Sequence, residues 1–187
     1  MTEGSNLFKE SFENLLKIRI ANALKLRKQF LQLPNSDTTV YRLLNGEGDG
    51  VSGLVMDVME ETVVIQSSAY WTEFHQKSIE NQLRKVLQTS EVIQNPKLIW
   101  TKMTNRLISD GWQDPSPSTT ASGNPVIEEP SQPMVVKENG IQFHVKPGEG
   151  QKTGFYCDQR ENRDLIRTLS KGESIIRTPS PDIFFLR

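Results

Sequence analysis

A cluster of glycines near residue 50 restricts the fold of this chain more than any other feature of its sequence. Four glycines occur between residues 46 and 53, and glycine disfavours helix because it loses the most backbone freedom on folding. Runs rich in β-branched and aliphatic residues lie nearby, at 39–44, 54–58 and 62–67. Such runs, separated by glycine, are typical of short strands joined by turns. The sequence therefore predicts a small sheet here.

Segments with helical periodicity lie on both sides of these strands. Apolar residues recur every three or four positions over residues 6–33 and again over residues 70–88, which is the pattern of amphipathic helices. Thr72 is a candidate N-cap for the second helix, and KLIWTKM (97–103) follows it as a further short strand. The resulting order of strand, strand, strand, helix and strand predicts an α+β fold.

The first helix has a basic face that two interpretations explain. It is either an ordinary solvated surface or a strip that contacts RNA phosphates. The chain as a whole contains 22 basic and 23 acidic residues and has a formal net charge of −1, so it has no overall attraction to nucleic acid. RNA binding would therefore require a local patch. The basic residues of this face are Lys17, Arg19, Lys25, Arg27 and Lys28.

The later part of the chain begins with a segment that cannot bury enough apolar surface to order itself. Residues 113–133 contain five prolines and four serines, which predicts a linker or a disordered insertion in a loop. Two short β runs follow in residues 134–147, separated by Asn139-Gly140, a pair that suits a tight hairpin turn. A final helix is predicted from Asp158, with Asp158 and Glu161 forming a capping box.

These patterns divide the chain into four parts. They are a central α+β domain with the first helix (1–112), the linker or loop insertion (113–133), the hairpin and helix (134–173) and an atypical tail (174–187) that contains two prolines and an apolar cluster. One cysteine excludes an internal disulfide and fits a reducing compartment. The first residues contain three acids and no apolar core, so we expect neither a secretory signal nor a transit peptide in them. No apolar run approaches the roughly 18 residues that span a bilayer. The sequence predicts a cytoplasmic protein without a membrane partner, although a longer form with its own targeting segment could enter an organelle.

Short motifs in the chain do not reach the patterns that they resemble. GEGQKT (148–153) lacks the glycine that a phosphate loop requires before Lys-Thr, because Gln151 occupies that position. NGEGDG (45–50) begins like a calcium loop but has Met56 where the bidentate glutamate belongs. Cys157 is predicted to be a buried thiol rather than a nucleophile. The two histidines are predicted to be surface or core residues, so these patterns indicate no metal site and no catalytic residue.

The block from residue 151 to residue 163 leaves two interpretations open. Lys152, Arg160 and Arg163 lie close together near the start of the final helix. A helix N-terminus with nearby cations can hold a polar or anionic ligand. An ordinary helix start with solvated charges explains the same residues.

Two long segments resemble a known family. YRLLNGEGDGVSGLVMDVMEETVVIQ (41–66) and ENGIQFHVKPGEGQKTGFYCDQRENRDLI (138–166) closely resemble the class I S-adenosylmethionine-dependent methyltransferases that include ribosomal RNA large subunit methyltransferase I, which makes 5-methylcytosine. The resemblance implies that a small central domain is followed by the entrance of a Rossmann-like catalytic domain. It also implies that S-adenosylmethionine is the cofactor, that ribosomal RNA is the partner, and that a cysteine of the enzyme adds to the target cytosine.

The second segment also implies a set of cofactor-site residues. Cys157 is not implied to be the catalytic cysteine, because the family has a hydrophobic residue at that place in the motif. The resemblance assigns no single role to any member of the set. The residues that match the motif bordering the cofactor pocket are Gln151, Lys152, Thr153, Phe155, Asp158, Gln159, Arg160 and Asn162.

The chain departs from the family after about residue 172. SIIRTPSPDIFFLR (174–187) contains neither the glycine-bearing cofactor loop nor the region of the catalytic cysteine, and members usually have an RNA-binding PUA domain before the part that matches. We therefore expect a form truncated at both ends and inactive alone. The alternative is a non-catalytic module that binds RNA or protein. The oligomeric state is left open.

Overall fold

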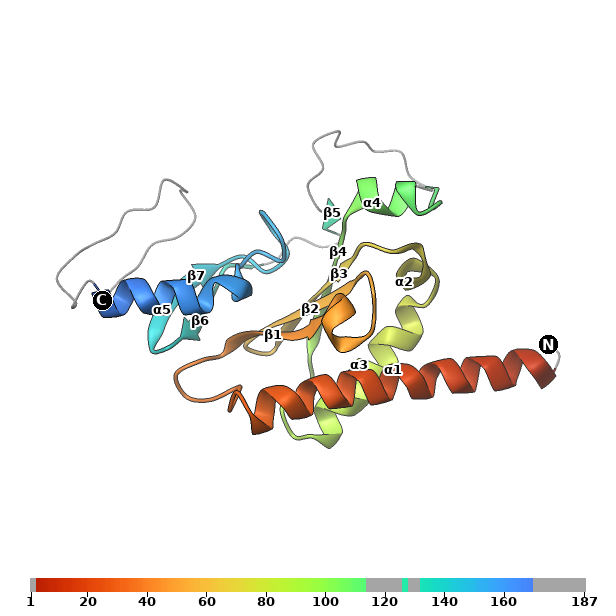
Figure 1. The fold of residues 1–187 in the computed structure, drawn as a ribbon, viewed down its shortest axis with the longest axis horizontal. Coiled ribbons are helices and arrows are strands. Elements are labelled where there is room, and N and C mark those ends of the chain that lie inside the picture. Colours follow the sequence, from red (N-terminus) through yellow and green to blue (C-terminus); the bar gives the residue numbers. More distant parts are fainter. Residues whose placement is uncertain (1–2, 114–125, 128–131, 170–187) are drawn as a thin grey trace.

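A five-stranded sheet lies at the centre of the molecule, with helices on one face and a two-stranded hairpin beside the other (Figure 1). The computed structural model describes residues 3–113, 126–127 and 132–169. The mixture of strands and helices agrees with the predicted α+β class. None of the helices in these described residues is long and apolar enough to cross a membrane.

The central sheet has the strand order β1-β2-β3-β4-β5. Strands β3 and β4 are parallel, and every other neighbouring pair is antiparallel. The glycine cluster forms a 3-10 turn, η1 (Gly46–Asp49), between the first two strands. The three strand runs predicted around the glycines and the later strand are confirmed. The strands are β1 (Val40–Asn45), β2 (Leu54–Met59), β3 (Thr62–Ser67), β4 (Lys97–Lys102) and β5 (Val126–Ile127).

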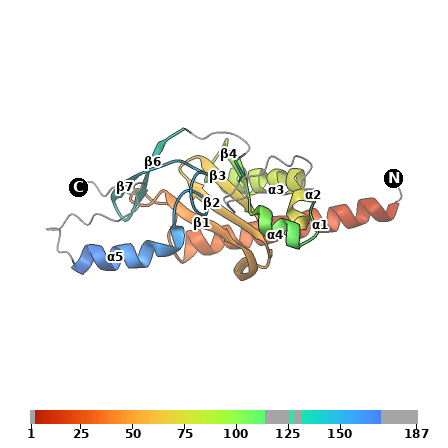
Figure 2. The same ribbon diagram turned by 90° about the horizontal axis from the view of Figure 1, so that it is seen from above.

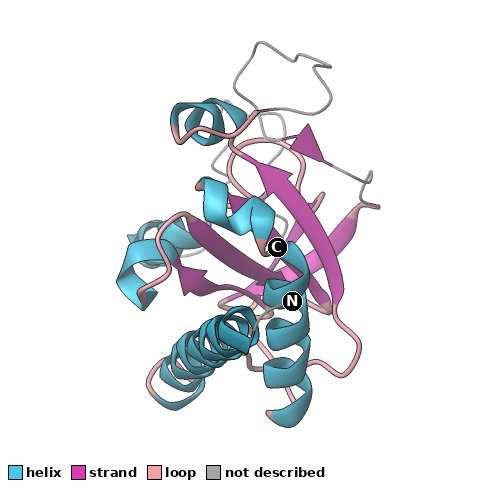
Figure 3. Ribbon diagram, turned by 90° about the vertical axis from the view of Figure 1, so that its right-hand side faces the viewer, coloured by secondary structure: helices cyan, strands magenta, loops and turns pink. Residues whose placement is uncertain are grey.

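Two helices cover one face of the sheet and enclose the main core (Figure 3). They are α1 (Glu3–Gln29) and α3 (Gln76–Thr89), which pack against each other. Short helices α2 (Tyr70–Phe74) and α4 (Thr104–Ser109) follow β3 and β4. Fully buried side chains from both long helices and the sheet meet in this core, among them Ile20, Leu24, Leu43, Ile65, Leu83 and Leu87.

The helix predicted over residues 70–88 is two helices, and its predicted N-cap is wrong. The chain breaks at His75, between α2 and α3. Thr72 lies inside α2 and is fully buried, and its hydroxyl donates to the Ala69 carbonyl oxygen at 2.7 Å. Because that hydroxyl also contacts Ser67 Oγ at 2.5 Å, it ties α2 to the end of β3 instead of capping a helix.

A hairpin packs against the face of the sheet opposite the helices. Strands β6 (Met134–Glu138) and β7 (Ile141–Val145) pair in antiparallel fashion. The connecting residues Asn139 and Gly140 have φ angles of 51° and 80°, so the predicted Asn-Gly turn is confirmed. A second core forms where the hairpin and the loop after it meet the sheet, and it contains Val40, Met59, Val64, Ile99, Val136, Phe143, Val145 and Phe155.

The last described helix begins differently from the prediction. A 3-10 turn, η2 (Cys157–Gln159), precedes α5 (Arg160–Leu169). The Asp158 carboxylate pairs with Lys152, and Glu161 pairs with Arg160, so the predicted capping box is wrong. Both carboxylates are drawn to nearby cations, which compete with the backbone amides for them.

The predicted linker and tail fall mostly outside the described residues. Only the adjacent apolar pair within the linker is described between 114 and 131, as β5, which pairs with Thr101 and Lys102 of β4. The tail at 174–187 lies wholly outside them. The domain boundaries at 112, 133 and 173 therefore stay predictions.

We predict that Gly53→Ala lowers the free energy of unfolding more than Gly140→Ala. Both glycines have φ near 80°, but a Cβ on Gly53 would lie 2.3 Å from Ala69 Cβ, whereas nothing lies within 4 Å of one on Gly140. Backbone strain is therefore shared, and the extra loss should be about 1–3 kcal/mol, the usual cost of overpacking. Urea unfolding of both variants measures the difference, and equal losses would contradict the contact.

Candidate functional site

The second motif forms a compact loop after β7, whose shape its own backbone fixes. The Gly148 amide donates to the Thr153 carbonyl oxygen at 2.8 Å, and the Gly154 amide donates to the Gln151 carbonyl oxygen at 3.2 Å. Gly154 has a φ of 97°, and a Cβ there would lie 2.4 Å from the Lys146 carbonyl oxygen. The glycine is therefore required for the close approach of the two chain segments. We call residues 148–159 the motif loop.

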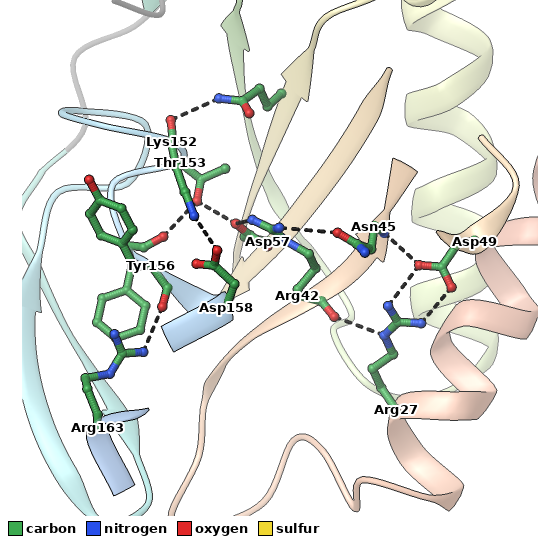
Figure 4. Close-up of polar contacts among 12 residues, drawn as sticks. Arg27, Arg42, Asn45, Asp49, Asp57, Lys152, Thr153, Tyr156, Asp158 and Arg163 are labelled. Atoms are coloured by element: carbon green, nitrogen blue, oxygen red, sulfur yellow. Dashed lines mark hydrogen bonds and ion pairs between the residues drawn. The ribbon is translucent and has the colours of Figure 1, made fainter. Parts of the chain in front are cut away.

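A buried carboxylate on the central sheet anchors the motif loop. Asp57 of β2 is fully buried on the sheet face opposite the helices, and Thr153 Oγ1 of the loop donates to its Oδ2 at 2.6 Å (Figure 4). Arg42 lies directly across from Asp57 in the β1–β2 register and donates to both carboxylate oxygens, at 2.9 and 3.1 Å. Gln66 of β3 adds a second link, from its side-chain amide to the Lys152 carbonyl oxygen at 3.1 Å.

The Arg42–Asp57 pair is electrostatically matched. Desolvation acts to lower the pKa of Arg42, but its hydrogen bond to Asp57 and the charge of Asp57 outweigh this and raise the pKa above its ordinary value. A buried carboxylate with no partner would be strongly unfavourable. Arg42 and Thr153 together satisfy both oxygens of Asp57, so the sheet and the motif loop depend on each other.

The same network continues into the first motif and the first helix. Arg42 Nη1 donates to the side-chain Oδ1 of Asn45 at 3.3 Å, and the backbone N–H of Asn45 donates to Asp49 Oδ2 at 2.6 Å. Arg27 of α1 binds both oxygens of Asp49 at 2.8 Å and donates to the Arg42 carbonyl oxygen at 3.0 Å (Figure 4). The polar residues of the two long motifs thus form one chain of contacts from α1 to the motif loop.

The burial of Arg27 corrects one expectation about the basic face of α1. Arg27 is only 7% exposed and pairs with Asp49, so it does not belong to a solvated or RNA-facing surface. The reason is the η1 turn, which brings Asp49 against the last turns of the helix. The other four basic residues of that face, Lys17, Arg19, Lys25 and Lys28, are exposed.

Arg163 of α5 holds the far end of the motif loop. Its guanidinium binds both oxygens of the buried Glu138 of β6, at 2.5 and 2.7 Å, and donates to the Tyr156 carbonyl oxygen at 2.8 Å. It also lies over the Phe155 ring, 4.6 Å from the ring centroid. Arg163 therefore joins the hairpin, the loop and α5, and its charge is neutralised within the chain.

The structure separates the eight predicted cofactor-site residues into inner and outer groups. The side chains of Thr153 and Phe155 are buried in the chain's own packing. On the outer side, the Lys152 ammonium pairs with the Asp158 carboxylate (Figure 4). The Tyr156 hydroxyl donates to Gln151 Oε1. The remaining three form contacts along η2 and α5: Asn162 donates to Gln159 at 2.6 Å, and Arg160 pairs with Glu161 at 3.2 Å.

The charge of Lys152 favours the ionised form of Asp158 on the outer side of the motif loop. Burial acts to raise the pKa of Asp158, but the hydrogen bond and charge of Lys152 lower it below the ordinary value. Cys157 behaves differently: desolvation first, and then the negative charge of Asp57, raise the pKa of its thiol well above the usual range. The thiol is half-buried, packs against the second core and stays protonated near neutral pH, so the predicted role as a packed thiol agrees with the structure.

The sequence did not identify Arg42 and Asp57 as anchors of the motif loop, although the position of Asp57 in its strand is unusual. Asp57 interrupts the apolar run of β2, LVMDVM, whose other residues are mostly buried. A charged residue in such a run is rarely buried without a partner. The partner could not be identified from the sequence, because Thr153 is 96 positions away.

Solved structures of methyltransferases share this fold. A protein of Streptococcus mutans assigned as a SAM-dependent methyltransferase matches with a TM-score of 0.61 and 21% identity, over 83% of this chain and 36% of that chain. A second structure, of a protein assigned as a methyltransferase in complex with SAH, matches with a TM-score of 0.59 and 21% identity, over 83% of this chain and 35% of that chain. The fold is therefore that of a part of SAM-dependent methyltransferases.

The sequence relatives define the family more narrowly. A ribosomal RNA large subunit methyltransferase of Deinococcus radiodurans is 31% identical over 75% of this chain. The ribosomal RNA large subunit methyltransferase I of Aeromonas salmonicida is 28% identical over 74% of it. The homologues of this chain are thus ribosomal RNA large subunit methyltransferases, and the resemblance predicted from the two motifs is confirmed. The chain spans about a third of their length, 32% of each. No protein-family model matches the chain.

We predict that Thr153→Val destabilises the fold, whereas Thr153→Ser leaves it nearly unchanged. Valine removes the donor to Asp57, and leaving a buried carboxylate short of a hydrogen bond costs about 1–3 kcal/mol. Thr101→Val is the matched control, because Thr101 is equally buried and its hydroxyl has no hydrogen-bond partner among the described residues. Urea unfolding should show a loss for Thr153→Val only. Equal effects at both positions would contradict the anchoring role of Thr153.

Proposed function

We propose that this chain is part of an enzyme that transfers a methyl group from S-adenosylmethionine to a cytosine of large-subunit ribosomal RNA. The observation that carries the proposal is the network that joins both family motifs and fixes the motif loop on the sheet. The names of the homologues support the rRNA substrate. The structural neighbour in complex with SAH, the demethylated form of the cofactor, supports S-adenosylmethionine.

The outer side of the motif loop fits one end of that cofactor. The amino-acid end of S-adenosylmethionine has an ammonium and a carboxylate. Lys152 and Asp158 offer the complementary charges within one ion pair, and Gln151 adds an amide beside them. In our proposal Lys152 would hold the carboxylate of the cofactor and Asp158 would hold its ammonium, in place of the internal Lys152–Asp158 pair. When bound, the cofactor supplies the methyl group, and these residues orient its charged end.

The remaining candidates have supporting roles in this proposal. Thr153 and Phe155 hold the loop from the inside, because both are buried. Gln159, Arg160 and Asn162 lie at the η2–α5 junction, where the first backbone amides of a helix favour a negative group. Cys157 does not serve as the attacking cysteine, since its thiol stays protonated. We therefore propose that the 187 residues alone bind the cofactor weakly and do not complete methyl transfer.

Ligand-observed NMR with S-adenosylmethionine tests the binding half of the proposal. We expect a weak saturation-transfer signal with the 187-residue chain that Lys152→Met and Asp158→Asn each reduce at least about fivefold, since a charge-assisted hydrogen bond contributes about 1.5–3 kcal/mol. Glu161→Gln is the matched control, because Glu161 lies three positions after Asp158 and its side chain is 83% exposed. Equal signals in all four proteins would contradict the assigned site.

Methyl incorporation into ribosomal RNA tests the other half. Purified chain, labelled S-adenosylmethionine and unmodified rRNA should give no incorporation above background. A rate comparable to that of a full-length relative would overturn the proposed dependence on further sequence. RNA binding without any cofactor signal would instead favour a non-catalytic RNA-binding module.

A further inference from the structure

A hollow lies where α2, the end of β4 and the segment after α4 meet, far from the motif loop in sequence. Its volume is about 470 Å³, and it is lined by Tyr70, Glu73, Phe74, Lys102, Gly111, Trp112 and Gln113. In Figures 1 and 2 the helices α2 and α4 lie on the side of the sheet away from α5. Sites of roughly 300–1,000 Å³ lined by aromatic residues are typical of small-ligand binding.

Three aromatic side chains form the walls of this hollow. Tyr70 is 37% exposed and Phe74 is 75% exposed, and their rings meet edge to face with centroids 5.8 Å apart. Trp112 is placed by the turn after α4, where its amide donates to the Leu107 carbonyl oxygen at 2.9 Å. Exposed rings held by backbone contacts present π faces on which a planar group can stack.

One residue that lines the hollow, Glu73, has a buried carboxylate whose two oxygens have different partners. The Glu73 side chain is only 8% exposed. Its Oε2 atom contacts Lys102 Nζ at 3.2 Å and Gln76 Nε2 at 3.3 Å, whereas its Oε1 atom is buried and has no hydrogen-bond partner in the described part of the chain. Buried polar atoms nearly always have a partner. A ligand that donates an N–H to Oε1, after a small shift of the flanking side chains, would supply one.

Charge in the hollow disfavours a cation as that ligand. Lys102 already neutralises Glu73, and its ammonium lies 5.8 Å from the centroid of the Trp112 ring. A second cation would meet the Lys102 charge at close range. The nearby Asp110 carboxylate already accepts a hydrogen bond from the backbone N–H of Tyr70 at 2.7 Å. A neutral, flat ring with an N–H edge meets both requirements.

We propose that this hollow binds one unpaired nucleobase of an RNA strand, stacked on Phe74 and Trp112, with an N–H group donated to Glu73 Oε1. The identification of the strand as RNA rests on the proposed function. Guanine fits best, because its ring N–H and amino group lie side by side and can both donate to one oxygen, whereas the ring N–H of uracil lies between two carbonyl oxygens that the carboxylate would repel. Base stacking on aromatic side chains is a general means of holding single strands. The phosphates of the strand stay outside the hollow, because the hollow has no uncompensated positive charge to attract them.

Fluorescence anisotropy with labelled 12-nucleotide RNAs tests the proposal. One strand contains only uridine, and the other has guanosine at every third position. We expect tighter binding of the guanosine strand, and a loss of roughly 5- to 150-fold in Phe74→Ala, the range given by one lost base stack. Glu73→Gln should remove the preference for guanosine while the uridine strand binds as before. Phe30→Ala is the matched control, because Phe30 is also 75% exposed but lies at the end of α1.

Three results would overturn the inference. They are equal losses in Phe74→Ala and Phe30→Ala, a guanosine preference that survives Glu73→Gln, and competition by an arginine-rich peptide but not by guanosine monophosphate. Thermal unfolding of each variant shows that a loss of binding does not come from a loss of fold. The cofactor signal measured by NMR is a separate readout at the motif loop, so RNA binding here and cofactor binding there can fail independently.

Discussion

The buried carboxylate of Asp57 fixes the position of the motif loop on the sheet. It lies on the face of the sheet that the hairpin covers, and it is compensated from two sides by Arg42 and Thr153. A charge at this depth is tolerated only with such partners. The partners come from a neighbouring strand and from a loop that is far away in sequence. The placement of the motif loop therefore depends on the folded sheet.

This dependence explains why two separate motifs characterise the chain. The first motif, which contains the glycine cluster, makes its polar contacts within the chain. It turns so that Asp49 meets Arg27, and it supplies Arg42 and Asp57 for the second motif. The second motif uses Thr153 for anchoring and leaves its other polar groups on the outside. The first motif and the motif that we propose to face the cofactor are thus joined by hydrogen bonds.

Local patterns in the sequence were sufficient for most of the fold. The strand over 62–67 and the Asn-Gly hairpin follow from β-branched runs and turn chemistry, both of which act over a few residues. The break at His75 and the failed capping box could not be predicted, because tertiary partners outweighed local preferences. Within the candidate site, Gln151, Lys152 and Asp158 lie on the outer side of the motif loop, and their assignment to a cofactor stays a prediction. The burial of Thr153 and the anchoring by Asp57 depend on long-range contacts, and a single sequence does not reveal them.

Amide hydrogen exchange in the Asp57→Asn variant tests whether Asp57 holds the motif loop in place. Asparagine keeps the size of the side chain but removes the charge that Arg42 and Thr153 compensate. We expect the backbone amides of Gly148 and Gly154 to exchange at least about tenfold faster than in the wild type. Local opening of the motif loop costs less free energy once the anchor at Asp57 is weakened. The amide of Val64, in the middle of the sheet, should keep its protection. Unchanged exchange in the loop, or an equal increase in loop and sheet, would contradict the claim that Asp57 holds the motif loop in place.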